Sequence, residues 1–132
     1  MNSIMRWMLV FVMVVVAAPA FSMEAVQIFR CEQEDEATEA DLRAFGKEWL
    51  KAARQMKGGE QLELYLYFPI AVNAPGAIDF LFAVHAPSVE QWGAFWDGYS
   101  GSPAAKADGG LEGKAVCPAS ALWEVQKVDP NP

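Results

Sequence analysis

The stretch FLFAVHAPSVEQWGAFWDGY, Phe80–Tyr99, decides the fold because its hydrophobic period changes halfway along. Its first residues alternate, with apolar side chains at positions 80, 82 and 84 on one side and His85 on the other, which is typical of a β-strand. A helix follows from Ser88, and Ser88 with Gln91 fits a capping box. The helix carries an apolar, mostly aromatic stripe at helical spacing, which we expect to be core. Its members are Val89, Trp92, Phe95, Trp96 and Tyr99.

The flanking segments extend this strand–helix unit on both sides. An alternating strand over 61–72 and the turn Asn73–Gly76 precede the strand at 77–85, so these two strands form a hairpin. Before the hairpin, a strand over 25–31 leads into a helix that Thr38 and Asp41 cap and that Gly58-Gly59 ends. The last strand covers 121–128.

The element order is therefore β-α-β-β-α-β, the pattern of a ferredoxin-like α+β sandwich. Right-handed crossovers predict an antiparallel four-stranded sheet in the spatial order 121–128, 25–31, 77–85, 61–72, with two helices on one face. Pro69 agrees, because it cannot donate to a sheet ladder and belongs at the edge where the hairpin's first strand lies.

The N-terminal residues, 1–22, have the layout of a secretory signal peptide, with a short apolar run and then small residues. We expect cleavage after Ala20 or Ser22, and a single soluble domain over 23–132 that is exported to the periplasm or secreted. An uncleaved anchor helix is the alternative. Cys31 and Cys117 are the two cysteines, and in an oxidising compartment we expect them to form a disulfide, which the predicted topology also permits.

The charge of the chain excludes some partners. It has 10 basic and 17 acidic residues, for a net charge of −7, and the predicted signal peptide contributes a basic residue and no acidic one. Such an excess repels nucleic acid and anionic membranes, so we expect neither as a partner of the mature protein. One histidine and two paired cysteines are too few good ligands for a zinc or copper site, so we expect no metal and no cofactor.

The sheet face opposite the helices is the candidate site. We place aromatic and apolar residues in its middle and ionisable ones, among them Glu63, Asp79 and Glu124, around it. A face of this kind is usually covered by a ligand or a second subunit. His85 is the candidate general base, oriented by Glu63 or Asp79, although a hydrogen-bonded surface histidine is the simpler interpretation. The candidate ligand-binding residues are Phe29, Tyr65, Tyr67, Leu81 and His85.

The element order, the size and this half-apolar face resemble the dimeric α/β-barrel superfamily over Ala25–Val128, by architecture only. The resemblance implies that two domains pack sheet against sheet as a homodimer, with space for a pocket between them. The resemblance does not identify a catalytic residue in this chain. We therefore expect a non-catalytic protein that binds a small, partly apolar ligand or a protein partner through this face. A cofactor-independent, monooxygenase-like barrel enzyme with a pocket around His85 is the alternative, and a structural module of an envelope assembly is a third possibility.

Overall fold

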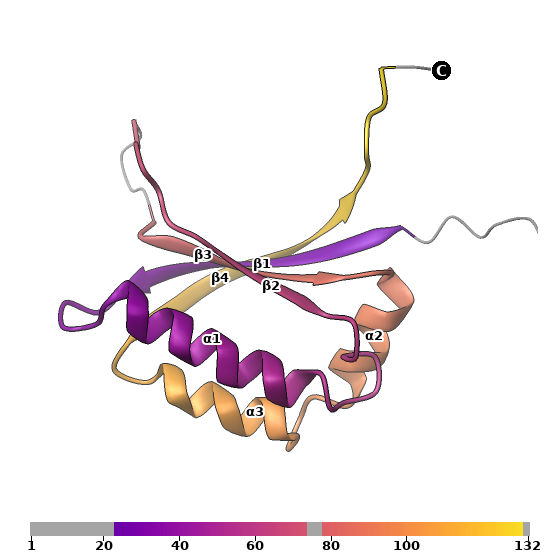
Figure 1. Cartoon of the computed structure of the whole chain (residues 1–132), viewed down its shortest axis with the longest axis horizontal. Coiled ribbons are helices and arrows are strands. Elements are labelled where there is room, and N and C mark those ends of the chain that lie inside the picture. Colours follow the sequence, from indigo (N-terminus) through magenta and orange to yellow (C-terminus); the bar gives the residue numbers. More distant parts are fainter. Residues whose placement is uncertain (1–22, 74–77, 131–132) are drawn as a thin grey trace, which may run out of the picture.

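The computed structural model describes residues 23–73 and 78–130, and Figure 1 shows how their elements are arranged. The predicted signal peptide, 1–22, and most of the turn predicted at Asn73–Gly76 lie outside the described residues. None of the helices within the described ranges is long and apolar enough to cross a membrane. In chain order the elements are β1 (Glu24–Gln33), α1 (Glu39–Ala53), β2 (Glu63–Tyr67), β3 (Phe80–Ala86), α2 (Val89–Asp97), α3 (Pro103–Ala107), the 3₁₀ helix η1 (Asp108–Leu111) and β4 (Ala115–Val125).

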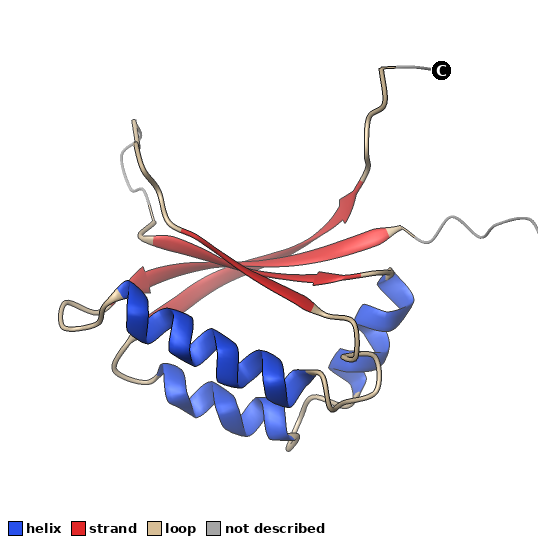
Figure 2. Cartoon of the chain, viewed as in Figure 1, coloured by secondary structure: helices blue, strands red, loops and turns tan. Residues whose placement is uncertain are grey.

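The four strands form one antiparallel sheet in the order β2-β3-β1-β4. The helices lie together on one face of this sheet (Figure 2). This arrangement confirms the predicted α+β ferredoxin-like sandwich and its strand order, with β2 at an edge. The bounds differ in several places: β4 begins six residues before the predicted Ala121 and ends at Val125, and α3 with η1 adds helical turns before it. The predicted strand over 61–72 is shorter, since β2 covers Glu63–Tyr67, so Pro69 lies beyond its end and not in the ladder.

Side-chain caps begin the helices where the sequence predicts them. In α1 the Thr38 hydroxyl accepts a hydrogen bond from the Asp41 amide at 3.2 Å, and an Asp41 carboxylate oxygen accepts one from the Thr38 amide at 2.9 Å. The Thr38 hydroxyl also donates to an Asp41 carboxylate oxygen at 2.6 Å, and this hydrogen bond, with the one from the Thr38 amide, holds the pKa of the Asp41 carboxyl below its ordinary value because both stabilise its ionised form. Ser88 and Ser102 cap α2 and α3 in the same way, each accepting from the amide three residues on.

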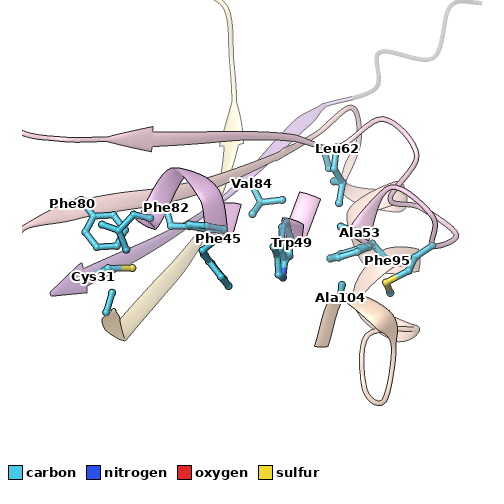
Figure 3. Close-up of a cluster of buried hydrophobic side chains, with 14 residues drawn as sticks. Cys31, Phe45, Trp49, Ala53, Leu62, Phe80, Phe82, Val84, Phe95 and Ala104 are labelled. Carbon is cyan, nitrogen blue, oxygen red and sulfur yellow. The ribbon is translucent and has the colours of Figure 1, made fainter. Parts of the chain in front are cut away.

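The hydrophobic core lies between the helix layer and the sheet (Figure 3). The ring of Phe82 on β3 lies at its centre, 5.6 Å from the Trp49 ring and 5.8 Å from the Phe45 ring. Phe95 on α2 is fully buried and packs edge-on against Trp49. The stripe of α2 therefore contributes to the core, although Trp92, Trp96 and Tyr99 are only partly buried. Val89, which was predicted to belong to it, is exposed, so that part of the prediction is wrong.

Cys31 and Cys117 form the predicted disulfide between β1 and β4. Ala119 is paired with Arg30 and faces away from the helices, so strict alternation would also turn Cys117 away from the buried Cys31. A β-bulge corrects this, because Cys117 and Pro118 together lie opposite Cys31. The bulge shifts the alternation of β4 by one residue and lets the two sulfur atoms meet.

Candidate functional site

The open face, as we call the side of the sheet opposite the helices, brings together most of the predicted site residues. In the register of β2 on β3, Glu63 lies opposite His85, Tyr65 opposite Ala83 and Tyr67 opposite Leu81. Tyr65, Tyr67, Leu81 and His85 therefore share this face as predicted. Phe29 does not: it is paired with Phe82 and points toward the helices. The prediction that Phe29 lies on the open face is wrong.

His85 is held by a residue that the sequence interpretation did not consider. Its ring nitrogen Nδ1 lies 2.9 Å from a carboxylate oxygen of Glu24, on the neighbouring strand β1. The Tyr65 ring lies edge-on to the imidazole at 4.9 Å, while the Tyr65 hydroxyl donates to Glu63 at 2.8 Å. That hydrogen bond to a carboxylate raises the pKa of Tyr65, because it favours the protonated phenol. Glu24, and not Glu63 or Asp79, therefore orients the imidazole.

Strand β4 makes the open face more apolar than predicted. Trp123 is paired with Val26 and points to the open face, so the neighbouring Glu124, which was predicted there, points to the other side. Large side chains on this face are well exposed: Tyr65 is 44% exposed, Tyr67 49% and Trp123 56%. The open face is therefore an exposed aromatic surface with an imidazole–carboxylate pair at one end.

A cavity of about 350 Å³ lies on the other side of the sheet, between β1, β3 and β4 and the helices. We call it the aromatic cavity. It is lined by six aromatic rings, a leucine, a disulfide cysteine and one carboxylate: Phe29, Phe45, Trp49, Phe82, Trp96, Tyr99, Leu111, Cys117 and Asp108. Its position explains why Phe29 is only partly buried although it points toward the helices.

Five of these side chains form a closed circuit of contacts around the cavity. The Phe29 ring packs against Phe82 on one side, at 6.2 Å, and against Trp96 on the other, at 6.4 Å. The Trp96 ring lies 4.4 Å from the Tyr99 ring, and the Tyr99 hydroxyl accepts a hydrogen bond from Trp49 Nε1 at 3.1 Å. Trp49 completes the circuit through its edge-on contact with Phe82. Because each ring is fixed by two neighbours, the wall is formed before any ligand arrives.

A short hydrogen-bonded chain gives this wall its polar end. The Tyr99 hydroxyl accepts from Trp49 and donates to a carboxylate oxygen of Asp108. Burial, with the hydrogen bond to Asp108, raises the pKa of Tyr99 strongly, so the phenol stays protonated. Burial also raises the pKa of the Asp108 carboxyl, although the hydrogen bonds from Tyr99 and Trp49 act in the opposite direction. Because Asp108 is also an exposed residue, its carboxylate is accessible both to solvent and to whatever occupies the cavity.

The sequence interpretation did not find this second site. It assigned Trp96 and Tyr99 to the core and gave Asp108 no role. One signal was present: Trp and Tyr carry polar atoms that need partners when buried. The indole nitrogen of Trp96 is buried and has no hydrogen-bond partner among the described residues.

Neither site offers a metal centre. Across residues 23–73 and 78–130, no group of three or more His, Cys, Asp or Glu side chains could hold a metal ion. The side chains present at the two sites are aromatic rings, an imidazole and carboxylates, which suit binding, orientation and proton exchange.

Comparisons with known proteins identify the fold. No protein-family model and no curated protein matches the chain. Among solved structures, a dimeric ferredoxin-like protein of unknown function from Thermobifida fusca is similar at a TM-score of 0.51 and 13% identity, over 80% of this chain and 93% of that one. A hydroxynitrile lyase from Passiflora edulis is similar at a TM-score of 0.55 and 8% identity, over 83% of this chain and 98% of that one. At these identities the similarity shows the architecture alone: the chain has the ferredoxin-like fold.

Proposed function

We propose that the protein is a non-catalytic binding protein whose aromatic cavity takes up a small, mostly apolar molecule. The observation that carries this proposal is a preformed cavity of about 350 Å³ with aromatic walls and a single carboxylate. Small-molecule sites have this character: they are concave and largely apolar, with a few polar groups that orient the ligand. Of the residues predicted to bind a ligand, Phe29 is the one that belongs to this cavity.

A variant that fills the cavity tests the proposal. Leu111→Trp adds volume at the cavity wall, whereas Val116→Trp adds the same side chain at an exposed position outside it. We expect 2-phenylethanol to raise the melting temperature of the wild type and of V116W by mass action, and not to raise that of L111W. Equal shifts in all three proteins would contradict binding in the cavity.

The open face has a different role in this proposal, as the contact with a second copy of the chain. The support is its exposed aromatic surface, together with the dimeric state of the Thermobifida fusca protein that shares the fold. Exposed apolar side chains gathered on one face of a sheet often mark an interface. In such a dimer, Tyr65, Tyr67 and Leu81 would be covered by the partner.

Two neighbouring residues of β4 provide a matched test of the dimer. Trp123 points to the open face and Leu122 to the opposite face, and both are exposed. We expect the wild type to sediment as a dimer at micromolar concentration, Trp123→Asp to sediment as a monomer, and Leu122→Asp to remain dimeric. A wild type that stays monomeric would refute this role of the open face.

Export completes the proposal. The Cys31–Cys117 disulfide supports it, because such bonds persist mainly in oxidising compartments. Expression of the full chain in a secreting bacterium, followed by mass spectrometry of the extracellular or periplasmic fraction, should find a mature protein that lacks residues 1–20 or 1–22. An intact N-terminus in the membrane fraction would instead establish an anchor.

An enzyme centred on His85 is the second candidate, favoured by one observation. The Glu24 carboxylate orients the imidazole through Nδ1, which is how a histidine base is commonly held. If a turnover activity is found, His85→Ala should abolish it and Glu24→Gln should reduce it. Full activity in His85→Ala would remove this candidate.

A further inference from the structure

Asp108 gives the aromatic cavity a charged group that purely apolar binding would not use. It is the only charged residue among the described residues that line the cavity. Within the described part of the chain it forms no ion pair with a basic side chain, and its neighbours are the neutral Tyr99 and Trp49. The Tyr99 hydroxyl compensates the negative charge of Asp108 only in part, and a positive charge in the cavity would compensate it further.

The aromatic rings that line the same cavity can also attract positive charge. The π-systems of Trp, Tyr and Phe are negative on their faces, and cations bind best to Trp. Trp49 and Trp96 stand on either side of Tyr99 in the circuit that surrounds the cavity. Aromatic walls with one carboxylate are the arrangement by which proteins recognise ammonium and quaternary ammonium groups.

We propose that the aromatic cavity binds a small organic cation, an amine or a quaternary ammonium compound, with Asp108 and the surrounding rings holding its positive charge. This inference rests on the proposed function and specifies the ligand class of the same site. A hydrogen bond from Tyr99 occupies one oxygen of Asp108, and a carboxylate has further acceptor positions for an ammonium N–H. The net charge of −7 also favours the approach of cations and disfavours that of anions.

The test compares cations with uncharged molecules of the same shape. The probes are choline with 3,3-dimethylbutan-1-ol, and phenethylamine with 2-phenylethanol, titrated calorimetrically into the mature protein. We expect at least one cation to bind about tenfold or more tightly than its uncharged counterpart, the scale of a desolvated cation–π contact. Asp108→Asn should remove this preference. Glu112→Gln, an equal change of charge at an exposed residue outside the cavity wall, should retain it.

The outcomes separate this inference from the proposed function. If the uncharged probes bind as tightly as the cations and L111W blocks both, the cation proposal is overturned and the binding function stands. If none of the probes binds the wild type, the cation proposal and the proposed binding function are both refuted. A preference that persists in D108N overturns the role of Asp108. Should D108N fail to fold, acidification of the wild type provides the same test, because protonation of Asp108 must abolish the preference.

Discussion

Gly58 is a position where one added methyl group should destabilise the protein through both backbone strain and steric overlap. Its φ is +81°, and a Cβ there would lie 2.5 Å from the Gln91 carbonyl oxygen and 2.6 Å from the Phe95 amide nitrogen. Both atoms belong to the backbone of α2, so neither can move without shifting the helix. Gly101 provides the matched control, because its φ is +73° and a Cβ there would meet no atom within 4 Å.

The two substitutions separate backbone strain from steric overlap. Alanine in the left-handed region costs about 1–2 kcal/mol at either position. Overlap with packed atoms adds about 1–3 kcal/mol at Gly58 alone. We therefore expect Gly101→Ala to lower the free energy of unfolding by about 1–2 kcal/mol and Gly58→Ala by roughly 2–5 kcal/mol.

Urea unfolding, followed by tryptophan fluorescence with the disulfide intact, measures the loss of unfolding free energy in each variant. The comparison requires that the slope of this free energy against urea concentration is the same in all proteins. Because α2 carries Trp96 of the cavity wall, Gly58→Ala should also weaken ligand binding, whereas Gly101→Ala should not. Equal losses of stability in the two variants would refute the close approach of the segment after α1 to α2.

Three further predictions concern the disulfide, the first helix cap and the cavity carboxylate. Replacing Cys31 and Cys117 together by serine should lower the free energy of unfolding by about 4–5 kcal/mol, because the bond spans 86 residues; calorimetry in the absence of reductant measures this. Thr38→Ala should cost about 1 kcal/mol in the same assay through loss of the α1 cap, and a loss near zero would contradict the capping box. Burial raises the pKa of Asp108, so its contribution to stability is complete below the ordinary aspartate pKa and is lost as the pH rises through the higher native pKa. Asp108→Asn should therefore gain stability relative to the wild type between acid and neutral pH, and a constant difference would refute the desolvation of this carboxyl.

Much of the fold could be predicted because its determinants are local. The alternation around His85 defines β3, and Ser88 and Thr38 begin their helices through hydrogen bonds that span only three residues. These local signals define the element order, and the element order with right-handed crossovers defines the sheet. The disulfide was predictable from this topology, because it brings the end of β1 beside the beginning of β4.

The candidate site was harder to predict because it depends on register. Phe29 follows Ile28 in a strand where both are apolar, so the sequence alone does not show which of the two faces the helices. The cavity combines Trp49, Tyr99 and Asp108 from three separate segments, and its defining hydrogen bonds join residues up to 50 positions apart. Spacing along the chain contains no signal for contacts of that kind, since they arise only when the helix layer packs.

The bulge at Cys117 and Pro118 also affects the outer edge of the sheet. A border strand exposes backbone amides and carbonyls to which another extended chain can add. The irregular backbone and the proline interrupt this row of unpaired backbone groups near the beginning of β4, since proline has no amide hydrogen to donate. Beyond them the regular stretch Ala119–Val125 carries one charged residue, Glu124, and exposes large apolar side chains to both sides. In concentrated solution, aggregation by edge-to-edge strand pairing would begin at this part of the edge strand β4. A lysine in place of Ala121 would block it.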